Sequence, residues 1–154
     1  MKHHFADFLD RPGDTWTITP NAQRWSCHVD DLAGVPQDTE RLTVTAGDRN
    51  WQRMLRLPQL RELTLHEPGQ DQLLALAQMP QLTALCISHA RPASLAMLEG
   101  LSALRELVLE YVSGFNDLSP VGRLPALHAL HLENLRRVSD FPVWPARPRC
   151  AAWP

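Results

Sequence analysis

The chain has 154 residues, enough for one domain with a hydrophobic core, and its 44% hydrophobic and 21% charged content is ordinary for a globular protein. The formal net charge is −2, without a run of like charges, which argues against a nucleic-acid binder and a polybasic membrane anchor. No apolar stretch is long enough to span a bilayer, and residues 1–10 lack the apolar region of a signal peptide. We therefore expect a cytoplasmic protein that binds neither nucleic acid nor membrane, with non-classical export to a host left open.

The chain contains three cysteines, Cys27, Cys86 and Cys150, which are odd in number and far apart. They match neither a disulfide framework nor a zinc pattern, so we expect reduced thiols. Among 15 basic residues Lys2 is the one lysine. We interpret this arginine bias as the sign of a GC-rich bacterial genome, an expectation about source and not about function.

Residues 1–37 are predicted to form an N-terminal cap. Trp16–Ile18 and Trp25–Val29 both alternate in polarity, and Pro20 and Asn21 between them are a turn signal. A stacked array of repeats has open edges that need covering. The pattern therefore predicts a β-hairpin-like cap, with one tryptophan from each strand closing the core.

Residues 38–143 carry the pattern L-x-x-L-x-x-L-x-L in tandem, and the chain contains 25 leucines in all. The period is 22, 22 and then 23 residues, and a weaker copy at Leu42–Val44 lies 21 residues before Leu63–Leu65. The four clear copies are Leu57–Leu65, Met79–Ile87, Leu101–Leu109 and Leu124–Leu132.

Two apolar residues separated by one residue mark a short strand with one buried face. Such strands stack in parallel about 4.8 Å apart, and each needs a crossover of about a dozen residues to return to the sheet. The pattern resembles the leucine-rich repeat family, with repeats of the internalin type, over residues 38–143. The resemblance implies an α/β solenoid of about five repeats, with a parallel β-sheet on its concave face and 3₁₀ or short helical turns on its convex face.

The return segments repeat as well. Asn116–Val121 and Ser139–Val143 resemble the Asp-Ile-x-x-Leu turn of internalin-type repeats, in which a carboxylate caps the turn, and Asp117 and Asp140 are the candidates here. The sequence departs from the family at the position of its asparagine ladder, so that ladder is absent or rebuilt. The positions concerned are Pro68, Ala90, Val112 and Leu135. The apolar residues of the return segments are Leu73 and Leu76, Leu95 and Leu98, Leu118 and Val121, and Phe141.

Residues 144–154 form a tail rich in proline and tryptophan. Trp144 occupies the position that Leu124 has at the start of the last repeat, but Arg147 occupies the position at which that repeat has a leucine. The tail is either a cap with Trp153 as its plug or a ragged end. In the second case the strand edge at Leu130–Glu133 is exposed and could pair with a second copy, so we expect a monomer or a weak homodimer.

Function is expected on the concave face, where side chains that alternate with the strand leucines point outward. Their composition runs from Arg and Thr, through small residues, to Glu and His. They form either an acidic patch for a basic partner or merely solvated polar side chains that keep the sheet soluble. Tyr111, Phe115 and Leu135 in the adjoining loops are either interface anchors or loop packing. The partner-binding candidates are Glu62, Thr64, His66, Cys86, Ser88, Glu106, Val108, Glu110, His131 and Glu133.

We predict no catalytic residues, no metal site and no cofactor. His66, His131, Glu110 and Glu133 are metal-binding types, but no closely spaced pair gives a ligand motif. Cys86 could be a nucleophile if His66 or His131 were its base, yet a small half-buried strand cysteine is the commoner case. Neither a phosphate loop nor a hydrolase motif is present.

The sequence therefore predicts a non-enzymatic module that binds another protein through the concave sheet. An adaptor, an immunity-type inhibitor and an effector-like binder all fit this description. The alternatives are a structural, self-associating protein that pairs through its C-terminal edge strand and, with less support, a cysteine-dependent enzyme.

Overall fold

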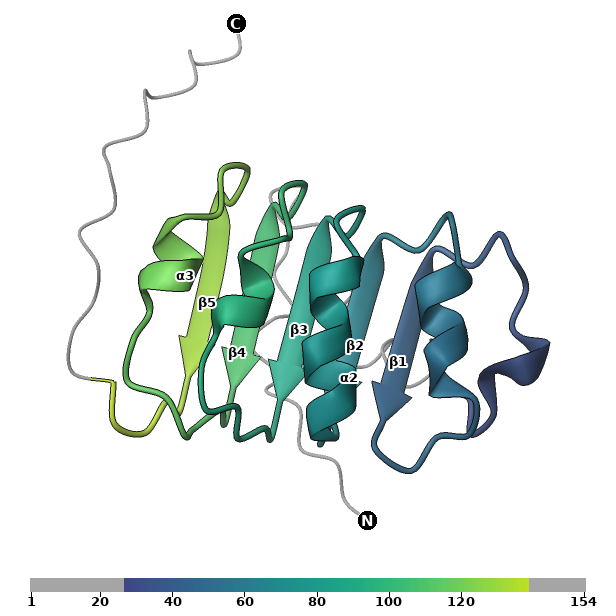
Figure 1. Ribbon diagram of the computed structural model, residues 1–154, viewed down its shortest axis with the longest axis horizontal. Helices are drawn as coiled ribbons and strands as arrows, with labels where there is room; N and C mark the ends of the chain where they lie inside the picture. Colours follow the sequence, from purple (N-terminus) through teal and green to yellow (C-terminus); the bar gives the residue numbers. More distant parts are fainter. Residues whose placement is uncertain (1–26, 139–154) are drawn as a thin grey trace, which may run out of the picture.

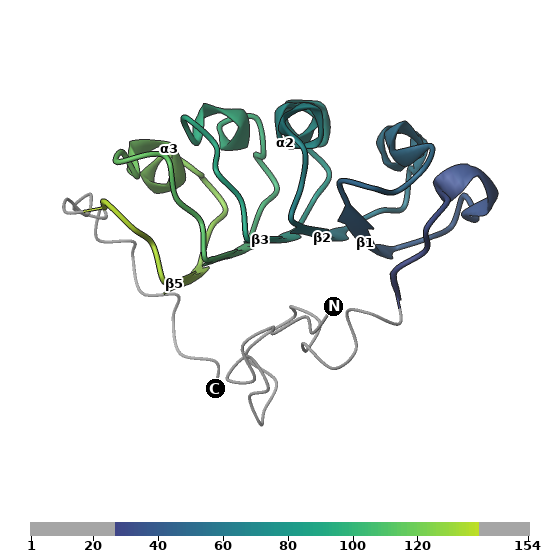
Figure 2. The same ribbon diagram turned by 90° about the horizontal axis from the view of Figure 1, so that it is seen from below.

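The computed structural model describes residues 27–138, which form a curved solenoid (Figures 1 and 2). Five strands make one sheet in sequence order, and each strand pairs in parallel with the next. The expected leucine-rich repeat solenoid is confirmed. The strands are β1 (Arg41–Thr45), β2 (Glu62–His66), β3 (Ala84–Ser88), β4 (Glu106–Glu110) and β5 (Ala129–Glu133).

Short helical segments return the chain from one strand to the next, and Figure 2 shows them along the outer, convex side of the arc. Most of them are 3₁₀ helices, as the spacing of three residues predicts. No helix in the described part of the chain is long and apolar enough to cross a membrane. The segments are η3 (Leu32–Gly34), η4 (Trp51–Arg56), α2 (Gln70–Ala75), η5 (Leu76–Gln78), η6 (Ala96–Leu98) and α3 (Ser119–Gly122).

The core between sheet and helices is almost wholly aliphatic. Strand leucines stack in register, as Leu63, Leu85 and Leu107 do, and these three are at most 2% exposed. Each such side chain contributes roughly 1.5–3 kcal/mol relative to exposure. The apolar residues predicted for the return segments are buried too, except Phe141, which lies outside the described residues. They are Leu73, Leu76, Leu95, Leu98, Leu118 and Val121.

The residue directly after each of the strands β2 to β5 adopts a left-handed conformation. We call Glu67, His89, Tyr111 and Asn134, with φ of 47°, 54°, 53° and 49°, the turn row. Its backbone N–H groups join the turns: Glu67 donates to Ser88 O, His89 to Glu110 O and Tyr111 to Glu133 O, each at 2.9 Å. These bonds extend the parallel pairing of the strands by one residue into the turns.

Three of the four positions at which the family carries asparagine belong here to the core, and the fourth, Pro68, is of intermediate exposure. Ala90 is 3% exposed and Val112 0%, while Leu135 packs partly buried against the same cluster. An apolar side chain at this position adds to the buried surface instead of supplying hydrogen bonds.

Carboxylates and hydroxyls hold the first turns of several convex segments. Asp117 Oδ1 accepts from Ser119 N–H at 2.8 Å and so caps the turn that leads into α3, as predicted. Asp31 accepts from Ala33 N–H at 2.9 Å in the same manner. Hydrogen bonds from Ser119 lower the pKa of Asp117, and the bond from the hydroxyl has a larger effect than that from the N–H. The pKa of Asp31 is lowered mainly by a hydrogen bond from Asn50 and, to a smaller extent, by that from Ala33. Asp140 lies outside the described residues.

The described part of the expected N-terminal cap continues the solenoid. His28 forms an isolated parallel bridge with Thr43, and Asp31 forms another with Arg49. This part of the segment therefore stacks on β1 in parallel as a partial repeat, while the other arm of the predicted hairpin, Trp16–Ile18, lies outside the described residues. Leu32, which is 0% exposed, closes the core at this end. Trp16 and Trp25, and the whole tail 144–154 with Trp144 and Trp153, lie outside the described residues.

Candidate binding surface

The ten candidate side chains lie on one face of the sheet in three columns set by the parallel register. Cys86 and Val108 form an apolar cluster separate from the main core, as expected for the face away from the helices. We call this face the concave sheet. Its columns are Arg41, Glu62, Ala84, Glu106 and Ala129; Thr43, Thr64, Cys86, Val108 and His131; and Thr45, His66, Ser88, Glu110 and Glu133.

The concave sheet is mostly buried, which the sequence did not predict. Ser88, Glu106 and Val108 are 0% exposed and Glu110 is 1% exposed. The candidates that reach intermediate exposure are Glu62, His131 and Glu133. The accessible carboxylates among the candidates are therefore Glu62 and Glu133, which lie on β2 and β5.

Two of the concave residues form a buried hydrogen bond. His66 Nδ1 lies 2.8 Å from Ser88 Oγ, because the register sets these residues side by side on β2 and β3. Cys86 lies beside Thr64 instead of His66 in that register. A serine beside a histidine is a possible nucleophile and base. Ser88 is 0% exposed, however, so no substrate reaches its hydroxyl in this structure, and the bond satisfies two buried polar groups.

An exposed aromatic stack borders the concave sheet along the turn row. The rings of His89 and Tyr111 stack with centroids 4.8 Å apart at 13°, and His66 meets His89 edge-on at 5.1 Å. Tyr111 is 44% exposed. Beside the stack runs a groove of about 270 Å³, which we call the rim groove. Its lining includes His89, Arg91, Tyr111, Ser113, Asn134 and Arg136.

Sequence reasoning named Tyr111 as a possible anchor but missed His89. The signal was available, because both residues directly follow a strand and lie 22 residues apart. Phe115, named together with Tyr111, is 4% exposed and belongs to the core, so for Phe115 the loop-packing alternative is correct.

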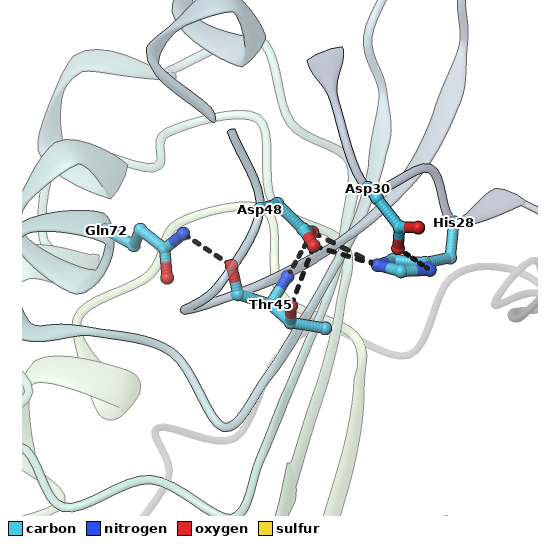
Figure 3. Close-up of polar contacts among 5 residues, drawn as sticks. All are labelled: His28, Asp30, Thr45, Asp48 and Gln72. Atoms are coloured by element: carbon cyan, nitrogen blue, oxygen red, sulfur yellow. Dashed lines mark hydrogen bonds and ion pairs between the residues drawn. The ribbon is translucent and has the colours of Figure 1, made fainter. Parts of the chain in front are cut away.

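A polar cluster closes the other end of the sheet, and Figure 3 shows its contacts. Thr45 donates to Asp48 through both its N–H (2.7 Å) and its hydroxyl (2.8 Å). His28 Nε2 lies 3.0 Å and 3.2 Å from the two oxygens of the same carboxylate. Gln72 Nε2 donates to Thr45 O at 2.8 Å. We call these four residues the His28 clasp.

Asp30, together with His28 and Asp48 of the clasp, forms a possible metal-ligand set that the sequence analysis missed. Ligand atoms of His28, Asp30 and Asp48 lie within 4.8 Å of one another. Both Asp48 oxygens already accept hydrogen bonds, and the Asp30 side chain is 92% exposed with its carboxylate 3.9 Å from His28 Nδ1. These contacts are those of a hydrogen-bonded clasp between residues 20 apart in sequence, so we assign the cluster a structural role.

Comparison with solved structures identifies the repeat type. Internalin C2 of Listeria monocytogenes matches with a TM-score of 0.54 and 25% identity over 71% of this chain and 47% of its own. A second internalin (inlF) of the same organism matches with a TM-score of 0.54 and 22% identity, over 65% of this chain and 29% of its own. The described part of this chain therefore has a leucine-rich repeat fold similar to that of these internalins. It spans less than half the length of either internalin. No protein-family model and no curated protein matches the sequence of this internalin-like chain.

Proposed function

We propose that this internalin-like chain binds another protein on its concave sheet, with the turn row as the rim of the site. The observation that carries the proposal is the exposed His89–Tyr111 stack at the edge of a continuous five-stranded face. Five strands about 4.8 Å apart present a face on the order of 20 Å wide, a width suited to a protein surface. Solenoids commonly bind through extended faces of this kind.

The rim has the composition of an interface anchor. Aromatic residues and arginine are enriched where binding energy concentrates, and Arg91 and Arg136 flank the stacked rings in the rim groove. The N–H groups of His89 and Tyr111 are bonded into the neighbouring strands. A partner therefore meets side chains on a backbone that is already ordered, which lowers the entropic cost of binding.

The volume of the rim groove favours a macromolecular partner. At about 270 Å³ it lies at or below the lower end of small-molecule pockets, which run from about 300 to 1,000 Å³. A groove of this size accommodates one or two side chains of a partner. The two arginines favour acidic side chains there.

The proposed role is non-enzymatic, since the buried His66–Ser88 pair offers a substrate no access. An adaptor, an immunity-type inhibitor and an effector-like binder would use the same surface and differ in the partner they hold. The alternative of self-association through β5 draws on one observation, that Leu130 and Leu132 are less buried than the leucines of β2 to β4. Light scattering over a concentration series distinguishes it, because a dimer through β5 doubles the mass.

The test uses the full chain as bait in lysate of its own organism, beside two variants. His89→Ser with Tyr111→Ser removes the rim stack, while Leu74→Ser on α2 alters a convex side chain that is 57% exposed. The expected result is a partner retained by wild type and Leu74→Ser, with the rim variant binding the purified partner about 10- to 100-fold more weakly. A partner lost by Leu74→Ser and retained by the rim variant would overturn the proposal.

A further inference from the structure

The rim groove brings together the same position of three consecutive repeats. The last residues of β3, β4 and β5 pair in register. The third residues after these strand ends are Arg91, Ser113 and Arg136, and all three line the groove. They lie at the edge of the sheet to which the strand arrows point in Figure 1. The groove therefore carries one arginine from each outer repeat and a small side chain between them.

The two arginines of the groove have no acidic partner among the described residues. Arg91 and Arg136 are exposed and form no ion pair within residues 27–138. Elsewhere in that range Arg41, Arg49 and Arg123 each lie against a carboxylate. No acidic residue occurs among the described residues that line the groove. Positive charge is therefore concentrated here, in a chain whose net charge is −2.

The backbone that carries this charge is ordered. Ser113 N–H donates to Ala90 O at 3.0 Å, which joins the turns after β3 and β4. Gly114, with φ of 105°, lies so close to the first of these turns that a Cβ would be 2.8 Å from Pro92 O. Arg91 precedes Pro92, which restricts its backbone to extended conformations. The repeat therefore sets the spacing of the two arginines, which is roughly 10 Å over two strand separations of about 4.8 Å.

We propose that the rim groove binds an acidic segment of the protein partner, in which carboxylates at positions i and i+2 of an extended chain pair with Arg91 and Arg136. This inference rests on the proposed function, because it names the partner chemistry of the same site. Side chains at i and i+2 of an extended chain lie on one face about 6.8 Å apart. The long stems of the arginines cover the remaining difference, and each guanidinium binds a carboxylate through two parallel hydrogen bonds.

The rest of the groove suits a peptide better than a nucleic acid. Ser113 is short, so the space between the arginines stays open, and its hydroxyl is a further donor. The rings of His89 and Tyr111 stack on each other with centroids 4.8 Å apart, which leaves no room for a base between them. Single-stranded nucleic acids bind along a continuous basic groove, whereas this groove contains one pair of arginines.

The experiment follows the ring signals of Tyr111 by NMR, in the full chain with isotope-labelled tyrosine. Tyr111 is the one tyrosine of the sequence, so every tyrosine signal reports on the groove. The probes are blocked peptides of the sequences Ala-Glu-Ala-Glu-Ala, Ala-Glu-Ala-Gln-Ala and Ala-Gln-Ala-Gln-Ala. The doubly acidic peptide is expected to bind about tenfold more tightly than the singly acidic one, because its second carboxylate binds the second arginine.

Single variants test whether each arginine binds one carboxylate. Arg91→Gln or Arg136→Gln is expected to reduce the advantage of the doubly acidic peptide to within about twofold. The matched control is Arg56→Gln with Arg105→Gln, which removes two exposed arginines outside the groove. This control is expected to retain the advantage of about tenfold.

Four outcomes would overturn the proposal. They are no saturable shift of the Tyr111 signals up to about 10 mM peptide, equal affinity for the three peptides, loss of the advantage in the control variant, and tighter binding of a thymidine oligonucleotide than of the doubly acidic peptide.

The titration requires no partner, so it separates this proposal from the proposed function. A partner that the His89→Ser, Tyr111→Ser variant loses, found together with equal affinity for the three peptides, rejects the acidic segment alone. A partner that this variant retains, found together with the expected peptide preference, rejects the proposed function and leaves the carboxylate preference of the groove in place.

Discussion

The two ends of the sheet have the same strand pattern and differ in burial. β1 carries the weakest copy of the repeat, Leu42-Thr-Val44, yet Leu42 is 4% and Val44 0% exposed. β5 carries a full copy, but Leu130 and Leu132 are of intermediate exposure. The strength of a repeat in sequence therefore does not decide how well its strand is buried. The burial of a strand depends instead on the neighbour that stacks on it, because each repeat of a solenoid contacts only the next.

The neighbour of β1 is the partial repeat held by the His28 clasp. Its bridges to Thr43 and Arg49 continue the sheet, and Leu32 extends the core past the first full strand. Arg53 adds hydrogen bonds at 3.2 Å and 2.9 Å to Val35 O, which join η4 to the same partial repeat. Polar contacts thus close the end at which the leucine pattern is weakest.

The largest expected effect comes from truncating one leucine at matched positions in the same column. Leu109→Ala on β4 removes a side chain that is 0% exposed and is expected to cost about 2–5 kcal/mol of unfolding free energy. Leu132→Ala on β5 is expected to cost about 1–2 kcal/mol, because less apolar surface is buried there. Urea unfolding monitored by circular dichroism measures both. Equal costs would show that β5 is as well packed as β4.

The second prediction concerns the clasp. Asp48→Ala removes the acceptor of the N–H and hydroxyl of Thr45 and the contact with His28 Nε2, all of which are partly buried. We expect a loss of about 1–3 kcal/mol of unfolding free energy. Asp30→Ala is the matched control, with a change within about 0.5 kcal/mol expected for a 92% exposed carboxylate. If both variants unfold at the wild-type urea concentration, the clasp does not stabilise the β1 end.

The fold was predictable because period and polarity alone determine it. Leucines repeating every 21 to 23 residues leave room for one short strand and one crossover, and the strands pair at those same offsets. The clasp was not predictable, because His28 and Asp48 belong to no motif and meet only through the bridge to Thr43. The burial of Glu106 and Glu110 was equally hidden, since alternation along a strand tells which face a side chain occupies and not how exposed that side chain is.

The third prediction tests the turn row, which follows β2 to β5 and has no counterpart after β1. A left-handed conformation is costly for any residue with a Cβ. Glu67→Gly is therefore expected to leave the free energy of unfolding unchanged or to raise it by up to about 1 kcal/mol. Glu67→Val is expected to lose about 1–2 kcal/mol, because a branched side chain is least tolerated there. Thermal unfolding of the pair measures the difference, and identical stabilities would mean that the turn relaxes out of this conformation.

The smallest effect is a pH dependence shared by the two ends. The pKa values of Asp31 and Asp117 are lowered in the folded chain, by hydrogen bonds from Asn50 and Ser119 respectively. A lowered folded-state pKa means that the unfolded chain binds protons first on acidification. The contribution of each carboxylate is therefore present above its unfolded pKa and is lost as the pH falls through the folded value. With Asp31→Asn or Asp117→Asn, the free energy of unfolding should fall less steeply below about pH 5 than in the wild type. Near neutral pH each variant should differ little from the wild type in this slope. Urea titrations at a series of pH values measure it. Asp117 is exposed and Asp31 is of intermediate exposure, so salt should weaken the difference between wild type and variants. If both variants keep the wild-type pH dependence, other groups cause the acid sensitivity.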